Sequence, residues 1–293
     1  MDYIDCNGKL HREQGVQDRL LLALYGTGIG RRIVKLLVRP GISAIAGKFL
    51  DTGWSRCLIS PFIRICRLDM SPFLRKEAKE FTSYNDFFTR EINPEKRPVD
   101  PDPCHLPAPC DGKVTVYPIG KDISFTIKNT VYTVESLLRS KRLARHFAGG
   151  YAVILRLCVD DYHRYLYPLS GEKSDNYYLP GVFHTVNPVA VETAGVFKEN
   201  AREFTLIRNK EFGTVLQMEV GALMVGRICN YHQSGNVKRG QEKGKFEFGG
   251  STVILLLQKD RAKIREDLLR NTAAEIETQM KMGECIAETF FCQ

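Results

Sequence analysis

Long apolar runs are missing from this sequence. No stretch reaches the roughly 20 apolar residues that a membrane-spanning helix needs, so we expect no spanning helix. The nine cysteines include no Cys-x-x-Cys pair, and the six scattered histidines give no spacing typical of a zinc site, so no metal is predicted. No secretory signal is visible either, and the odd cysteine count favours a reduced intracellular compartment over a disulfide framework.

Internal repeats, low-complexity tracts and nucleic-acid recognition motifs are also absent. The chain has 293 residues with 43% hydrophobic and 26% charged content, which is enough to bury a sizeable core in one large domain, with or without an appendage. Its net charge of +8 favours an anionic partner: nucleic acid, an acidic membrane or a phosphate-bearing substrate. Without a recognition motif, nucleic acid ranks last among these partners.

The N-terminal part predicts short helices. Between Gln17 and Leu50, apolar residues alternate with arginines and glycines in a pattern typical of amphipathic helices. Two interpretations remain open: the helices cap the core, or they lie in the interface of an anionic bilayer. Residues 69–83 are predicted to be helical, with Ser71 as the N-cap and Pro72 at the first helical position. We therefore predict an N-terminal helical, membrane-associating region over residues 1–83.

The remainder of the chain predicts strands. Buried or alternating strand patterns cover residues 113–117, 151–159, 204–208, 214–220 and 253–257. After Asp260 the sequence is charged and predicts a helical tail as far as Met280. The predicted fold class is α+β: a strand-rich core with N-terminal amphipathic helices and a short helical C-terminal tail.

Three polar residues lie next to predicted strands. Ser251 follows Gly249 and Gly250 and opens the buried strand, where glycine leaves the preceding carbonyl unhindered. Asp111 lies in an Asp-Gly turn before the strand that begins at residue 113, and His163 follows the strand of residues 151–159. Each of the three, taken alone, is more often structural than catalytic.

Two arginines lie in the aromatic and charged stretch of residues 84–100. Arg90 and Arg97 could bind a carboxylate or phosphate group in bidentate fashion, or form structural salt bridges. Both interpretations remain open at the level of sequence.

Seven stretches in one order carry a family resemblance. They read FFTREINPEKRPVD, PCDGKV, DYHRY, PGVFHTVNPVAVE, EFGTVLQMEVGALMVGRI, FEFGGSTVILL and MGE. Together they resemble the phosphatidylserine decarboxylase proenzymes, with the closest similarity to the shorter form whose processing motif reads GGST. The resemblance covers roughly residues 84–284, and it implies a catalytic domain over residues 84–293.

The resemblance implies a zymogen that cleaves itself. Ser251 would attack the carbonyl of Gly250, and an N-to-O acyl shift and β-elimination would give a chain of residues 1–250 and a chain of residues 251–293. Ser251 would become a covalent pyruvoyl group, the expected cofactor, which forms a Schiff base with the substrate amine and acts as an electron sink. The expected reaction of phospholipid biosynthesis converts phosphatidylserine to phosphatidylethanolamine and CO₂.

The resemblance also implies an Asp–His–Ser relay, with Asp111 and Ser251 as two of its members. Family members commonly have two histidines three residues apart; His163 matches the first, which is implicated in decarboxylation, and Leu166 stands at the second. Three replacements for the missing base remain open: His163 serves both steps, His184 reaches the site, or Asp111 acts directly with a pKa raised by burial. We favour His163.

We expect a peripheral protein on the cytoplasmic side of the cell membrane. Its expected partners are phosphatidylserine, an anionic membrane surface and its own two cleaved chains, which remain together as a heterodimer. Two alternatives remain: a pyruvoyl decarboxylase of a soluble amino acid, or an uncleaved, non-catalytic lipid-binding homologue.

Overall fold

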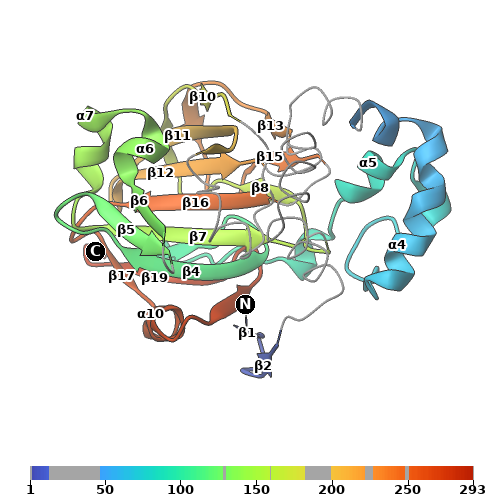
Figure 1. Cartoon of the computed structure of the whole chain (residues 1–293), viewed down its shortest axis with the longest axis horizontal. Coiled ribbons are helices and arrows are strands. Elements are labelled where there is room, and N and C mark those ends of the chain that lie inside the picture. The colour runs from blue at the N-terminus through green and yellow to red at the C-terminus, as the bar shows by residue number, and fades with distance from the viewer. Residues whose placement is uncertain are drawn as a thin grey trace, which may run out of the picture.

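An eleven-stranded sheet organises this computed structural model (Figure 1), which describes residues 2–12, 47–127, 130–158, 160–181, 199–221, 227–247 and 251–292. The strand order is β14 (Gly235–Val237), β9 (Gly171–Lys173), β11 (Arg202–Asn209), β12 (Gly213–Val220), β16 (Ser251–Leu257), β7 (Tyr151–Leu157), β4 (Gly112–Pro118), β18 (Glu277–Met280), β1 (Tyr3–Ile4) and β2 (Leu10–His11), with β10 (Tyr177–Leu179) on β11. The described pairs are antiparallel except β1 with β18. In these antiparallel pairs, each strand therefore begins where its neighbour ends.

Strand β16 lies in the middle of this sheet, and all seven of its residues are buried. Ile254 and Leu256 pack on one face, with the hairpin of β5 (Ser124–Ile127) and β6 (Thr130–Thr133) and with α6 (Val134–Leu138) and α7 (Lys141–Ala144). Val253 and Leu255 pack on the other face. Burial on both faces explains why the sequence here is a continuous apolar run rather than an alternating one.

Two small sheets and a helix cover the second face. One sheet is β13 (Ile228–Asn230), β15 (Glu242–Phe246) and β8 (Arg164–Leu166); the other is β17 (Ala262–Ile264), β19 (Cys285–Thr289) and β3 (His105–Pro107). Residues from both sheets and from α10 (Glu266–Ala273) join the same apolar cluster. The strand-rich α+β fold predicted from the sequence is thus observed.

The described N-terminal residues form a separate apolar cluster. It includes Leu50 and residues of α4 (Ile59–Ile65) and α5 (Tyr84–Phe88), and Figure 1 shows α4 and α5 to the right of the sheet. The short helix η1 (Gly53–Leu58) directly precedes α4 in the chain. Ser83 caps α5 by accepting a hydrogen bond from the Asp86 N–H at 3.1 Å. The amphipathic helices predicted before residue 47 fall mainly on residues 13–46, outside the described residues. No helix in the described ranges is long and apolar enough to span a bilayer.

The helix predicted over residues 69–83 is wrong. Only the short 3₁₀ helix η2 (Ala78–Glu80) forms there, held by a reciprocal capping box between Glu77 and Glu80. Ser71 does not cap a helix, because its hydroxyl donates to Asp69, and Phe73 forms an isolated bridge to Ile92. Local capping and pairing with the next segment therefore replaced the predicted helix.

The C-terminal tail contains fewer helical residues than predicted. Its helix α10 spans only residues 266–273, and strands β18 and β19 follow it. Thr278 lies opposite Val114 of β4, so residues 277–280 fill a place at the side of the large sheet. Non-local pairing explains this difference, because local helix propensity carries no information about whether β4 is free to pair with residues 277–280.

One disulfide joins Cys104, just before β3, to Cys292, just after β19. The two residues are 188 positions apart in sequence, and the pairing of β3 with β19 brings their segments together. The other seven cysteines are free. The cysteine pattern did not predict this single bond.

Candidate active site

The ends of three central strands, β16, β7 and β4, lie side by side at one end of the large sheet. Ser251, the first residue of β16, pairs with Leu157, the last residue of β7. Strand β4 begins at the same edge, because its residue Lys113 pairs with Arg156. The antiparallel register thus gathers Ser251, the segment after β7 and the segment before β4.

Glycine is required at the start of β4. Gly112 has φ +156°, and a Cβ built on it would lie 2.9 Å from the carbonyl oxygen of Arg156. A larger residue would push β4 away from β7. Gly112 therefore lets Asp111, immediately before it, approach the end of β7.

His163 and Ser251 are in contact. The imidazole Nδ1 lies 3.2 Å from the Ser251 Oγ, and both side chains are fully buried. The other ring nitrogen, Nε2, lies 2.9 Å from the carbonyl oxygen of Cys158. A carbonyl only accepts hydrogen bonds, so in the neutral imidazole Nε2 carries the hydrogen and Nδ1 presents its lone pair to the serine hydroxyl. This is the arrangement of a serine nucleophile and its general base.

The plane of this imidazole is set by Phe88 of α5. The two rings stack with their centroids 4.0 Å apart and their planes 28° from parallel. Phe88 is itself only 1% exposed. The stacked ring restricts rotation of His163 and keeps water away from it.

Asp111 is held by groups other than His163 and Ser251. Arg97 donates to both carboxylate oxygens of Asp111, at 2.8 and 2.7 Å, and the N–H of Met282 donates to Oδ1 at 2.8 Å. Burial opposes the charge on Arg97, yet the hydrogen bonds and charge of Asp111 raise the pKa of Arg97 overall. Both carboxylate oxygens of Asp111 are thus already occupied by donors, which weakens its interpretation as the direct base.

Leu166 lines a cavity of about 320 Å³ next to this ion pair. The cavity is also lined by Leu74, Glu91, Ile92, Pro94, Arg97, Val99, Tyr162, Arg164, Tyr165, Gly240, Glu242 and Met282. Arg164 pairs there with Glu242 at 2.8 Å and with Glu91 at 3.2 Å. Leu166, which stands where family members commonly have a second histidine, therefore lines the same cavity as Arg97. His184 and Gly250 lie outside the described residues.

Asp161 is a titratable neighbour that the sequence did not single out. Its Oδ2 accepts a hydrogen bond of 2.7 Å from the N–H of Cys158, the residue whose carbonyl oxygen holds His163. Burial, and then the charge of Asp160, raise the pKa of Asp161 to about 7. The pair Asp160–Asp161 is visible in the sequence before His163, but the half-burial of Asp161 beside Cys158 is not.

A buried ion pair lies on the same side of the sheet as Ser251. Lys243 of β15 binds Glu219 of β12, and both side chains are fully buried. Glu219 lies opposite Val253, two residues along β16 from Ser251. This pair is a further charged feature that sequence reasoning missed.

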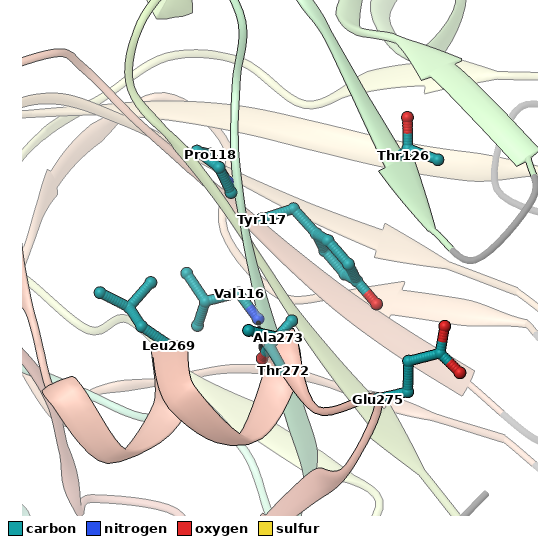
Figure 2. A pocket seen from close by; sticks show the side chains of 8 residues that line it. All are labelled: Val116, Tyr117, Pro118, Thr126, Leu269, Thr272, Ala273 and Glu275. Carbon is teal, nitrogen blue, oxygen red and sulfur yellow. Dashed lines mark hydrogen bonds between the residues drawn. The ribbon is translucent and has the colours of Figure 1, made fainter.

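Other candidate sites fit the chemistry less well. A cavity of about 430 Å³ beside α10 (Figure 2) contains Tyr117, Thr272 and Glu275 but no histidine or cysteine. Among the described residues, two clusters have metal-ligating atoms within 4.8 Å: Asp100–His105–Cys285 and Asp102–Cys104–Cys292. The sulfurs of the second cluster form the disulfide. Neither cluster contains Ser251, His163 or Asp111.

The fold and the site define a strand-rich α+β protein in which a buried serine at a strand start faces a buried histidine. A sequence model of the phosphatidylserine decarboxylase family matches residues 84–288. The chain is 41% identical over 282 residues to phosphatidylserine decarboxylase proenzyme 2 of Clostridium acetobutylicum, covering 96% of each chain. It is 38% identical over 268 residues to the proenzyme of Chlamydia muridarum, covering 90% of this chain and 89% of that one. The chain belongs to the phosphatidylserine decarboxylase family.

Proposed function

We propose that this protein is a self-processing, pyruvoyl-dependent enzyme that converts phosphatidylserine to phosphatidylethanolamine and CO₂. Family membership supports the reaction, since the relatives are named as proenzymes of this decarboxylase. The observation that carries the proposal is the contact of 3.2 Å between His163 Nδ1 and Ser251 Oγ, with Nε2 fixed on Cys158.

In self-cleavage, His163 takes the proton of the Ser251 hydroxyl at Nδ1. The serine oxygen then attacks the carbonyl carbon of Gly250, the C–N bond breaks as the ester forms, and the proton passes to the freed amine. β-Elimination of the Gly250 carboxylate separates chains 1–250 and 251–293, and hydrolysis of the remaining group at position 251 releases ammonia and leaves the pyruvoyl ketone. One histidine suffices for this step, because its tautomer already points the lone pair at the nucleophile. The geometry thus favours His163 over Asp111 as the base.

The residues around Ser251 suit the pyruvoyl group that would be derived from it. Position 251 is completely buried and borders His163, so a reactive carbonyl there is shielded from water. Such a group supplies a ketone that condenses with the substrate amine and withdraws electrons as CO₂ leaves. His163, close by, holds the proton that the substrate carbon then needs.

An exposed apolar and basic face supports membrane association. Trp54 and Ile65 are 85% and 82% exposed, and Phe49 and Leu58 are exposed beside them in the chain. The neighbouring Arg56 and Arg64 add positive charge. We propose that this face docks peripherally on the anionic cytoplasmic leaflet, as part of a membrane-associating region over residues 1–83.

Docking there would place the lipid near the catalytic residues. Ile59 of α4 and Phe88 of α5 belong to one apolar cluster, and Phe88 stacks on His163. The proposed catalytic domain, residues 84–293, therefore begins with the helix that links both parts. Docking through α4 would thus bring the bilayer to the cluster whose Phe88 contacts His163.

The proposal is tested by intact mass and by substrate choice. Wild-type protein purified from cells should yield two reduced chains, with the short one blocked at its N-terminus, whereas Ser251→Ala should remain whole and inactive. Vesicles containing phosphatidylserine should be decarboxylated, and free serine and aromatic amino acids should not. Turnover of free amino acids without lipid turnover would favour the soluble-substrate alternative. A single full-length wild-type chain would favour the uncleaved lipid-binding alternative.

A further inference from the structure

We propose that Asp100, His105 and Cys285 form a binding site for a divalent transition metal, with Zn²⁺ as the best chemical match. The three side chains offer a carboxylate oxygen, an imidazole nitrogen and a sulfur that all lie within 4.8 Å of one another. The inference stands apart from the proposed function, because none of the three residues belongs to the Ser251–His163 pair. Sequence spacing did not reveal the site, because its ligands come from two distant segments.

The backbone brings these two segments together. Strand β3 pairs with β19, so that Cys285 lies opposite Pro107, and the N–H of Asp100 donates to the carbonyl oxygen of Gly283 at 3.0 Å. Gly283 has φ +94°, and a Cβ built on it would collide with the carbonyl oxygen of Pro98. Only glycine allows this close approach, so the fold itself fixes where the three ligands lie.

The imidazole of His105 is oriented as in metal sites. Its Nδ1 lies 2.7 Å from Asp100 Oδ2, and its Nε2 faces two further carboxylates, Asp102 Oδ2 at 3.8 Å and Glu288 Oε1 at 3.9 Å. When Nδ1 binds an ion, the ring hydrogen moves to Nε2, where these carboxylates accept it directly or through a water. Metal-binding histidines commonly donate their other N–H to a carboxylate in this way.

The local charge also favours a cation. The carboxylates of Asp100, Asp102 and Glu288 all lie within 4 Å of the His105 ring. Arg239 borders the group, but it donates to the backbone carbonyl oxygen of Asp102. Three carboxylates beside one arginine leave negative charge that a divalent ion would compensate.

The mixed oxygen, nitrogen and sulfur donors select the kind of ion. Zn²⁺ binds carboxylate, imidazole and thiolate at about 2.0–2.3 Å in tetrahedral geometry, so the 2.7 Å contact of His105 with Asp100 would widen to only about 3.3 Å. All three side chains are half-buried, so water can supply the fourth ligand. Cys285 is a free cysteine, and on binding its thiol proton passes to solvent with no change in oxidation state.

A neighbouring cluster is the main competitor for the ion. Asp102, Cys104 and Cys292 also hold metal-ligating atoms within 4.8 Å of one another. In a reducing buffer, the sulfurs of Cys104 and Cys292 become thiols and could bind the ion instead. A variant at Cys292 therefore separates the two sites.

The test measures metal binding directly. Untagged full-length protein is freed of metal with a chelator and titrated with Zn²⁺ or Co²⁺ in a phosphine reductant. We expect one ion per chain, a thiolate-to-cobalt charge-transfer band, and a thermal unfolding midpoint that rises with Zn²⁺ concentration. The same result is expected for Ser251→Ala, so failure of the proposed self-cleavage would leave this measurement unaffected.

The variants assign the ligands. Cys285→Ser and His105→Ala should each weaken Zn²⁺ binding at least about a hundredfold, since loss of an outer-shell partner alone costs 10–100-fold. Cys285→Ser should also abolish the charge-transfer band. Cys292→Ser, and Cys57→Ser at an exposed free cysteine, should keep both the affinity and the band. Circular dichroism of each variant shows that it is folded.

Three results would overturn the site. The first is wild-type protein that shows no charge-transfer band. The second is an affinity that remains unchanged in folded His105→Ala or Cys285→Ser. The third is loss of binding in Cys292→Ser with binding retained in Cys285→Ser, which would assign the ion to the neighbouring cluster.

Discussion

Phe88 stacks on His163 with 4.0 Å between the ring centroids, which joins the N-terminal apolar cluster to the candidate base. We expect Phe88→Leu to slow decarboxylation up to about tenfold, because an aromatic pair contributes roughly 0.5–1.5 kcal/mol beyond its buried area. Single-turnover kinetics on phosphatidylserine vesicles would measure the effect.

Phe81→Leu is the matched control for that change. Phe81 is equally buried in the same cluster but packs edge-on against Phe87 rather than on the imidazole. Both variants should lose stability, and only Phe88→Leu should lose rate. Equal rates in the two variants would remove the proposed positioning role of Phe88.

His163 should be needed for both chemical steps. We expect His163→Ala to reduce self-cleavage and decarboxylation by about 10²–10⁴-fold, the usual contribution of a general base or acid. Leu166→His should still cleave, because the side chain at position 166 borders a cavity of about 320 Å³. Time-resolved intact mass checks cleavage; prompt processing of His163→Ala would assign the base to another residue.

The ion pair of Arg97 with Asp111 should contribute strongly to stability. Its side chains are only 11% and 9% exposed, so Arg97→Met leaves a nearly buried carboxylate without its partner. Breaking a buried pair in this way costs about 3–5 kcal/mol. Urea unfolding in the uncleaved Ser251→Ala background gives the value for one intact chain.

An exposed ion pair supplies the comparison for Arg97. Arg208 and Glu172 are 75% and 66% exposed, so Arg208→Met should cost about 0–1 kcal/mol. Similar losses in both variants would mean that the Asp111 carboxylate is well solvated after Arg97 is removed.

Membrane binding should depend on the exposed apolar side chains of η1 and α4. We expect Trp54→Ser combined with Ile65→Ser to weaken sedimentation with anionic vesicles at least tenfold, because two large apolar groups no longer enter the interface. Val131→Ser, at an exposed apolar residue on the β5–β6 hairpin, is the control. Unchanged binding of the double variant would place the docking face elsewhere.

Asp161 should make stability fall as the pH rises towards neutrality. Its pKa is about 7 in the folded protein and near 3.8 in the unfolded chain, so between these values the folded state holds the extra proton. The stabilisation is complete below about pH 3.8 and is lost as the pH passes 7.

Asp161→Asn should flatten this part of the stability profile, whereas Glu172→Gln, at an exposed carboxyl, should not. Urea unfolding of Ser251→Ala protein from pH 5 to pH 8 would measure both slopes. A wild-type slope that persists in Asp161→Asn would assign the proton to another group.

The sequence predicted the strands that periodicity marks strongly. Residues 251–257 form a fully buried strand as expected, and the strand ends place His163 beside Ser251. The bidentate role of Arg97, left open by the sequence, is taken by Asp111 within the protein. Short local patterns carried less information, since residues 69–83 did not form the predicted helix.

Features that depend on distant pairing were not predictable. Cys104 and Cys292 meet only because β3 and β19 are neighbours, and Asp161 becomes half-buried only once the chain folds around Cys158. The same applies to residues 277–280, whose strand needs the free side of β4. Sequence periodicity describes one element at a time, so it could not report these partnerships.

The placement of β16 between β12 and β7 has a consequence for the order of events in the cell. Residues 251–293 supply that central strand, and also β18 beside β4, so neither product could assemble the sheet by itself. Under the proposed scheme, the catalyst is created only after folding has succeeded. A misfolded copy would lack the Ser251–His163 contact and remain inactive, so only correctly folded copies would become enzymes.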